Sequence, residues 1–235
     1  MNFQDLYNRA LVRSDLGELK AALSDWNQLL RVNPTAAGYY NRGVVQARIG
    51  DTQTSPGQYR RAKQSAIADY TQALQHDPRY LEAYYNRGLT RDQLADKRGA
   101  IKDYTQALRI DPSFTDAYNN RGLACAGLGC QRGAIKDYSR AIAINPSFAG
   151  AYLNRGNAWA QLGSYSKAIK EFDQALGIDP NFAEVYGNRG KLRSKLGDQP
   201  GAIADYQKAA ELFFDRGNIN NYQIIVDLFR ALGTH

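Results

Sequence analysis

Hydrophobic and polar positions recur along this chain in a pattern that repeats every 34 residues. Glycines mark one phase of the repeat, alanines mark a second and prolines mark a third. A fixed period of this length is typical of an array of small, similar structural units. The recurring residues are Gly88, Gly122, Gly156 and Gly190; Ala66, Ala100, Ala134, Ala168 and Ala202; and Pro78, Pro112, Pro146 and Pro180.

Each period has the pattern of two amphipathic helices joined by a tight turn. Apolar residues recur at helical spacing over 149–162, Gly163 interrupts the pattern, and it resumes over 165–178. Asp179-Pro180 then ends the second helix, because the residue before a proline disfavours helical dihedral angles. We call the two helices A and B, and we number each unit so that the glycine of its Asn-Arg-Gly sequence is position 8.

Small and aromatic residues occupy fixed positions of the unit and predict how helices A and B pack. Positions 8 and 20 are small, which lets the two helices approach closely, and large side chains at positions 4 and 24 fill the wedge between them. Position 4 is Leu6, Tyr39, Tyr84, Tyr118, Tyr152 and Tyr186; position 24 is Trp26, Tyr70, Tyr104, Tyr138, Phe172 and Tyr206.

This arrangement resembles the tetratricopeptide repeat (TPR) family over residues 3 to about 216. The resemblance implies an all-α fold: a right-handed superhelix, or α-solenoid, of six helix-turn-helix repeats forming a single domain over residues 3–235. The Asn-Arg-Gly variety looks like repeats abundant in bacteria and plastids, including assembly factors of photosynthetic complexes. The repeats are expected at about 3–35, 36–80, 81–114, 115–148, 149–182 and 183–216.

Two segments depart from the regular repeat. The stretch Asn221–Gly233 predicts one more amphipathic helix, at about 220–233, that caps the last repeat, as stacked arrays require; a separate docking helix is the alternative. Position 11, often aromatic in the family, is Arg91 in one unit and Arg193 in another.

The second unit carries an insertion of 11 residues, 51–61. Ser55 followed by Pro56 predicts a helix start, so helix B of this unit is expected to begin about three turns early. The extension is a candidate contact for an acidic partner, and a tolerated surface insertion is the alternative. The candidate contact residues are Tyr59, Arg60, Arg61 and Lys63.

The arginine of the Asn-Arg pair lies at position 7, at the edge of the face that helix A turns toward helix B. Position 23 of helix B is acidic in all six units: Asp25, Asp69, Asp103, Asp137, Glu171 and Asp205. Because a guanidinium binds a carboxylate through two parallel bonds, we expect each arginine to pair with the acid of its own unit. An arginine row for a phosphate or RNA backbone is the alternative.

The asparagine lies at position 6, on the side of helix A almost opposite the face that turns toward helix B. It is expected on the concave surface formed by successive A helices. An amide both donates and accepts, so a row of asparagines suits the main chain of an extended peptide. TPR superhelices such as that of O-GlcNAc transferase hold peptides with asparagines at this position; bonding to a neighbouring repeat or to water is the alternative. The candidate peptide-binding residues are Asn8, Asn41, Asn86, Asn120, Asn154 and Asn188, with Tyr7, Tyr40 and Tyr85 at position 5 of the first three units.

Some TPR domains of co-chaperones hold a chaperone's terminal carboxylate with a clamp of lysines, asparagines and an arginine. That clamp needs Lys at position 5, Asn at position 9 and bases at positions 2 and 6. Position 5 never carries Lys here and position 2 never carries a base, so we expect no such clamp.

Composition and motifs narrow the function. The net charge of +7 permits acidic partners, mean hydropathy of −0.55 suits a soluble protein, and neither an apolar run long enough to span a membrane nor a signal peptide is present. Cys125 and Cys130 match neither a disulfide framework nor a zinc site. No catalytic or nucleotide-binding motif occurs, so we expect no catalytic residues, metal or cofactor.

The sequence therefore predicts a cytoplasmic, non-enzymatic scaffold or adaptor that binds an extended protein or peptide segment in a concave groove. Two alternatives stay open. The chain could bind nucleic acid along its arginines, which the scattered charge makes the less favoured reading, or it could self-assemble into a homo-oligomer through its repeat ends.

Overall fold

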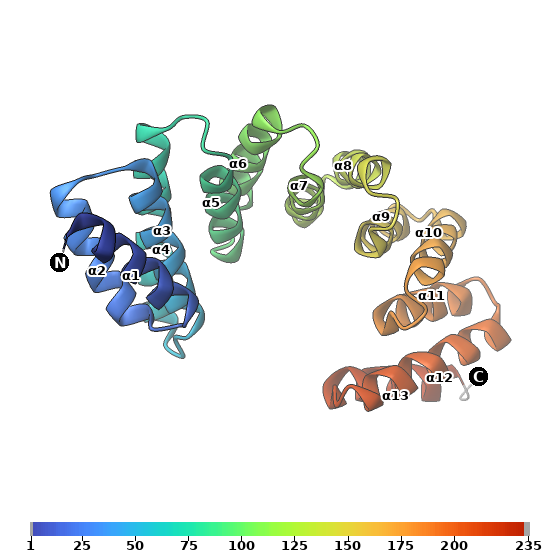
Figure 1. Cartoon of the computed structure of the whole chain (residues 1–235). Coiled ribbons are helices and arrows are strands. Elements are labelled where there is room, and N and C mark those ends of the chain that lie inside the picture. Colours follow the sequence, from blue (N-terminus) through green and yellow to red (C-terminus); the bar gives the residue numbers. More distant parts are fainter. Residues whose placement is uncertain (1, 233–235) are drawn as a thin grey trace. The chain divides into compact units, whose positions relative to one another are not determined.

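The computed structural model describes residues 2–232 and is all-helical over that range, with 13 helices (Figure 1). The expected all-α architecture of helical hairpins is confirmed. The helices are α1 (Phe3–Asp15), α2 (Leu19–Val32), α3 (Ala36–Asp51), α4 (Pro56–His76), α5 (Leu81–Gln93), α6 (Lys97–Ile110), α7 (Thr115–Gly127), α8 (Gln131–Ile144), α9 (Ala149–Gln161), α10 (Tyr165–Ile178), α11 (Ala183–Lys195), α12 (Gln199–Asp215) and α13 (Ile219–Leu232).

The chain divides into two compact units, Met1–Ala124 and Cys125–His235, with the boundary in the last turn of α7. The first unit contains the hairpins α1/α2, α3/α4 and α5/α6 and most of α7. The second contains α8, the hairpins α9/α10 and α11/α12, and α13. In each hairpin the first helix is helix A of a repeat and the second is helix B.

The turns between helices A and B have a local cause in the sequence. Gly163 adopts a φ of +74° and Gly197 a φ of +84°, a left-handed conformation that glycine reaches without strain. The third repeat has Ala95 at the same point, with a φ of 65°. Asp96 and Asp198 follow these turns in their repeats, and each accepts a hydrogen bond from a backbone N–H of the first turn of helix B.

The core of each hairpin follows the small and aromatic pattern. A Cβ atom added at Gly88 would lie 2.8 Å from the Tyr104 ring, so only glycine fits against this side chain. Tyr104 is 1% exposed, and Ala100, at position 20, is fully buried. The aromatic wedge and its two small neighbours therefore set how closely helices A and B pack.

The insertion in the second repeat lengthens both helices of the hairpin. Helix α3 has 16 residues and α4 has 21, whereas the A helices of the other repeats have 13 and the other B helices have 14, except α12 with 17. Helix α4 begins at Pro56, as expected, but Ser55 makes no side-chain cap hydrogen bond. The expectation that helix B begins about three turns early is corrected, because α4 begins only about two turns early and about one turn of the insertion extends α3 instead.

Helix α13 packs against α11 and α12 of the second unit. Its Ile225 is buried, and Tyr222, Leu228 and Leu232 pack against the same cluster, which includes Phe213 of α12. The helix begins at Ile219, and its expected end at Gly233 lies outside the described residues. Within residues 2–232 no helix is both long enough and apolar enough to cross a membrane.

Candidate functional site

The arginine of the Asn-Arg pair is a structural bridge within five of the six hairpins, as the sequence predicted. In the third repeat, Arg87 donates from Nε to Oδ2 of Asp103 at 3.0 Å and from Nη2 to Oδ1 at 2.7 Å. The same two-bond geometry joins Arg9 to Asp25, Arg42 to Asp69 and Arg189 to Asp205, and one bond of 2.7 Å joins Arg155 to Glu171.

Each of these guanidiniums, except that of Arg9, also reaches helix B of the preceding repeat. Nη1 of Arg87 donates to the hydroxyl of Thr71 at 3.0 Å, so this side chain ties α5 to both α6 and α4. Sequence reasoning missed this contact, although the polar residue that recurs at position 25 signals it. The equivalent pairs are Arg42 and Asn27, Arg121 and Thr105, Arg155 and Ser139, and Arg189 and Asp173, at 2.6–3.1 Å.

The arginines at position 11 are second partners for the same carboxylates. Arg91 donates to Asp103 at 2.8 Å, and Arg193 donates to Asp205 at 2.9 Å. Their departure from the usual aromatic residue therefore has a structural cause, since a buried carboxylate needs its remaining lone pairs satisfied.

In the first repeat the same arrangement lowers the pKa of the carboxyl group that the arginines bind. Burial by itself would raise the pKa of the Asp25 carboxyl, but hydrogen bonds from Arg9 and Arg13 outweigh burial and hold that pKa below its ordinary value.

The asparagine row is partly used by the scaffold in the first unit. Nδ2 of Asn86 donates to the Tyr40 hydroxyl at 2.8 Å, and Nδ2 of Asn120 donates to the Tyr85 hydroxyl at 2.9 Å. Each amide thus binds the position-5 tyrosine of the preceding repeat. The remaining expected members of the row lie on the A helices as follows: Asn8, which accepts from Gln4, on α1; Asn41 on α3; Asn154 on α9; and Asn188 on α11.

The position-5 tyrosines pack between repeats as well as bordering this face. The ring centroid of Tyr40 lies 4.9 Å from that of Tyr80, and that of Tyr85 lies 4.6 Å from that of Phe114. Burial raises the pKa of Tyr40 and of Tyr85 above the ordinary value for tyrosine. A role for these rings in peptide binding stays a prediction.

Tyr7, in the first repeat, makes an edge contact with Trp26 of its own hairpin, at a centroid distance of 5.3 Å. It therefore packs within a repeat, and its role in peptide binding likewise stays a prediction.

One of the four candidate contact residues near the start of α4 is not available to a partner. Lys63 is 1% exposed, its Nζ donates to Oδ1 of Asp51 at 2.6 Å, and its ammonium lies 5.5 Å from the ring centroid of Tyr59. The expectation that Lys63 projects from the surface is corrected, because its stem fills the space between the lengthened α3 and α4. Arg60 and Arg61 are exposed.

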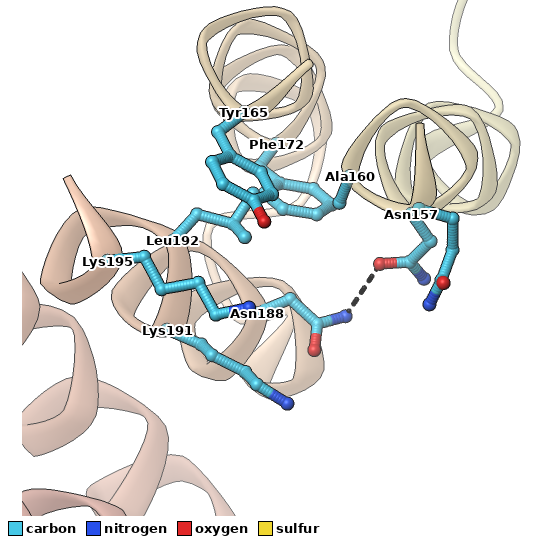
Figure 2. A pocket seen from close by; sticks show the side chains of 9 residues that line it. Asn157, Ala160, Tyr165, Phe172, Asn188, Lys191, Leu192 and Lys195 are labelled. Atoms are coloured by element: carbon cyan, nitrogen blue, oxygen red, sulfur yellow. Dashed lines mark hydrogen bonds between the residues drawn. The ribbon is translucent and has the colours of Figure 1, made fainter. Parts of the chain in front are cut away.

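A pocket of about 520 Å³ opens between α9 and α11 in the second unit (Figure 2). Asn188, one of the expected site residues, lies in its wall and donates from Nδ2 to Oδ1 of Asn157 at 3.1 Å. The ammonium of Lys195 lies 5.4 Å from the ring centroid of Tyr165. The lining residues are Asn157, Ala160, Gln161, Tyr165, Phe172, Asn188, Lys191, Leu192 and Lys195.

An apolar hollow of about 430 Å³ adjoins this pocket on the α13 side. It shares Asn157, Asn188 and Lys191 with the first pocket, and α13 adds Ile224 and Leu228 to its wall. Together we call the two hollows the α9–α11 groove. Sequence reasoning found only Asn188 of this set; the other signal was the change from apolar residues to Asn157 and Lys191 at position 9.

The groove has the chemistry of a binding site. Its amides donate and accept hydrogen bonds, its lysines attract anions in the first pocket, and α13 supplies apolar surface to the second hollow, whose wall also contains Glu184. Within residues 2–232, no cluster of three or more His, Cys, Asp or Glu side chains has the arrangement needed to hold a metal ion.

Family models match the chain from residue 7 to residue 215. One model described as "Tetratricopeptide repeat" matches residues 7–66 and 63–112, and a second model with the same description matches 183–215. A third model, described as "TPR repeat", matches 98–129, 131–163 and 156–197. The human protein named tetratricopeptide repeat protein 6 is 32% identical over 87 residues, which are 37% of this chain and 15% of that protein. The match therefore spans a small part of that relative.

Solved structures share the fold. MamA is 25% identical with a TM-score of 0.64, covering 71% of this chain and 99% of that one. A tetratricopeptide repeat protein from Parabacteroides merdae is 20% identical with a TM-score of 0.73, covering 98% and 93%. YrrB, described as a TPR protein with an unusual peptide-binding site, is 21% identical with a TM-score of 0.63, covering 80% and 91%.

Proposed function

Because this chain belongs to the tetratricopeptide repeat family, we propose that it is a non-enzymatic scaffold that binds an extended segment of another protein. The segment lies along the A helices, and the α9–α11 groove is its principal site in the second unit. The observation that carries this proposal is the open pocket of about 520 Å³ with the Asn157–Asn188 amide pair in its wall.

An extended peptide needs partners for its main chain whatever its side chains are. The amide pair uses one N–H of Asn188 and the carbonyl of Asn157, which leaves the carbonyl of Asn188 and the N–H groups of Asn157 for a ligand. A pocket of this volume is within the range that encloses small ligands and single side chains. Main-chain pairing then supplies the grip, and the pocket supplies the preference.

The arginines contribute to this function by rigidity. Their guanidiniums are engaged by carboxylates and by the preceding helix B, as in Arg87, so within each unit they tie neighbouring hairpins together rather than present a charged row. A rigid row of A helices lowers the entropy lost on binding, which favours affinity.

The test is affinity capture from the native cell with the full chain as bait, followed by mass spectrometry. We expect the Asn157→Ala, Asn188→Ala double variant to lose the proteins that the wild-type chain retains. The control, Gln174→Ala with Asn181→Ala, removes two exposed amides outside the groove and should retain them. Identical partner lists for all three baits would defeat the proposal.

A further inference from the structure

We propose that the α9–α11 groove selects peptides in which a carboxylate side chain stands close to a bulky apolar side chain. This inference rests on the proposed peptide-binding function and specifies its ligand. It follows from the distribution of charge on α11, from the absence of acids in the wall of the first pocket, and from the hollow beside it. Glu184 lines that second hollow and disfavours a ligand carboxylate there, which directs the carboxylate to the first pocket.

Helix α11 carries four bases at alternate positions, and helical geometry sends them to two faces. Arg189 and Arg193 turn toward α12, where both pair with Asp205, at 2.6 and 2.9 Å. Lys191 and Lys195 line the pocket instead. In the described part of the chain, no carboxylate forms an ion pair with either lysine.

The two lysines create a site without a counter-charge in the wall of the first pocket. Like charges four residues apart on a helix repel each other, and neither Asp nor Glu lines this pocket. Lys195 is held beside the Tyr165 ring by a cation–π contact, which positions the ammonium at the pocket wall. A ligand carboxylate between Lys191 and Lys195 would relieve the repulsion and gain two charge-assisted hydrogen bonds.

The adjoining hollow specifies the second feature of the ligand. Ile224 of α13 is 56% exposed, and Leu228 lies in the same wall. Alternate side chains of an extended peptide point the same way and lie about 7 Å apart. An acid at one residue and a large apolar group two residues away therefore address the two hollows that share Lys191.

This site differs from the carboxylate clamp of co-chaperone domains. Its bases stand at positions 9 and 13 of a single helix A, whereas the clamp takes its bases from positions 2, 5 and 6 of several repeats. The groove is thus suited to an internal acidic side chain next to an apolar one.

The test uses the full chain and fluorescent decapeptides with a Gly-Ser background. The four probes contain Glu-Ser-Phe, Gln-Ser-Phe, Glu-Ser-Ala or Lys-Ser-Phe at the centre, and affinity is measured by fluorescence anisotropy. We expect Glu-Ser-Phe to bind most tightly. Lys191→Gln with Lys195→Gln should weaken it about tenfold, since each exposed ion pair contributes modestly. The control Lys102→Gln with Lys170→Gln removes the same charge at exposed sites outside the groove and should bind as the wild type does.

A charge-reversed variant guards against loss of folding. Lys191→Glu with Lys195→Glu should prefer the Lys-Ser-Phe peptide over Glu-Ser-Phe, and such a switch requires a folded groove. Equal affinity for Glu-Ser-Phe and Gln-Ser-Phe, with both lost in the Asn157→Ala, Asn188→Ala variant, would overturn the inference and leave the proposed function standing.

Two further outcomes would also overturn the inference. If the Glu-Ser-Ala peptide, or a uridine oligonucleotide of matched charge, bound as tightly as the Glu-Ser-Phe peptide, the groove would attract anions without selecting among them. Binding of none of the four peptides at millimolar concentration, together with unchanged capture of partners by the asparagine variant, would overturn both the inference and the proposed function.

Discussion

At the residue scale, the recurring Asn-Arg pair contains two neighbours with separate roles. The arginine has a structural role, because a buried carboxylate and the preceding helix B both bind its guanidinium, as in Arg87 with Asp103 and Thr71. The asparagine has a structural contact as well: one N–H of the Asn86 amide donates to the Tyr40 hydroxyl, and the side chain is partly exposed. A functional test must therefore separate lost ligand contacts from lost scaffold contacts.

The buried carboxylate gives the first stability prediction. Asp103→Asn leaves Arg87 and Arg91 without their shared anion, and breaking such a buried pair costs about 3 kcal/mol. We expect urea unfolding to show this loss in the free energy of unfolding. Asp15→Asn, on an exposed residue, should change it by less than about 0.5 kcal/mol. Equal effects of the two substitutions would contradict the bridging role.

The hydrogen bond between Asn86 and Tyr40 gives the second prediction, which concerns both stability and partner binding. Tyr40→Phe removes the acceptor and frees the amide, with an expected cost of about 1 kcal/mol. If the amide row binds peptide, this variant should keep the captured partners, whereas Asn86→Ala should lose some. Loss of the same partners in both variants would assign the amide a purely structural role.

At the element scale, the sequence predicted what depends on local pattern. The helix pairs, the turns at glycines such as Gly163 and the small residues under the aromatic wedge follow from the 34-residue period and helical geometry. The bonds from the five arginines other than Arg9 to the repeat before their own did not follow, because they depend on how hairpins stack. The groove was also missed in large part, since Lys191 and Lys195 look like ordinary exposed lysines until α9 and α13 are placed beside them.

The lengthened hairpin shows the same limit and gives the third prediction. Position alone made Lys63 a surface residue, yet its stem is buried between α3 and α4. Because its partner Asp51 is 54% exposed, the ion pair contributes little and packing dominates. Lys63→Met should therefore stay close to wild-type stability, while Lys63→Ala should lose about 2 kcal/mol.

Urea unfolding of these two variants, with Arg61→Ala as the exposed control, measures this difference. Equal losses for Lys63→Met and Lys63→Ala would show that the charge, rather than the stem, holds the extension.

At the scale of the whole molecule, the net charge of +7 is a poor guide to function, because bases do two kinds of work. Arginines of the repeats, such as Arg87 and Arg189, pair with acids inside their hairpins, and lysines without an acidic partner line the groove. Many of the tyrosines also have a structural role, because their rings are buried. Burial raises the pKa of a set that spans both units: Tyr40, Tyr70, Tyr80, Tyr85, Tyr104, Tyr138 and Tyr206.

That set predicts the stability of the chain at alkaline pH. Burial favours the neutral phenol, so the folded-state pKa lies above the ordinary value of 10.0, and it is raised to about 12 in Tyr80. The unfolded chain releases these protons first. The stabilisation is therefore complete below pH 10 and is lost as the pH rises through the folded-state values. Absorbance at 295 nm and circular dichroism at 222 nm, followed together from pH 8 to 13, should show a late group of tyrosines that ionises as the helices unfold. Ionisation of all 16 tyrosines near pH 10 with the helical signal intact would contradict the packing described for them.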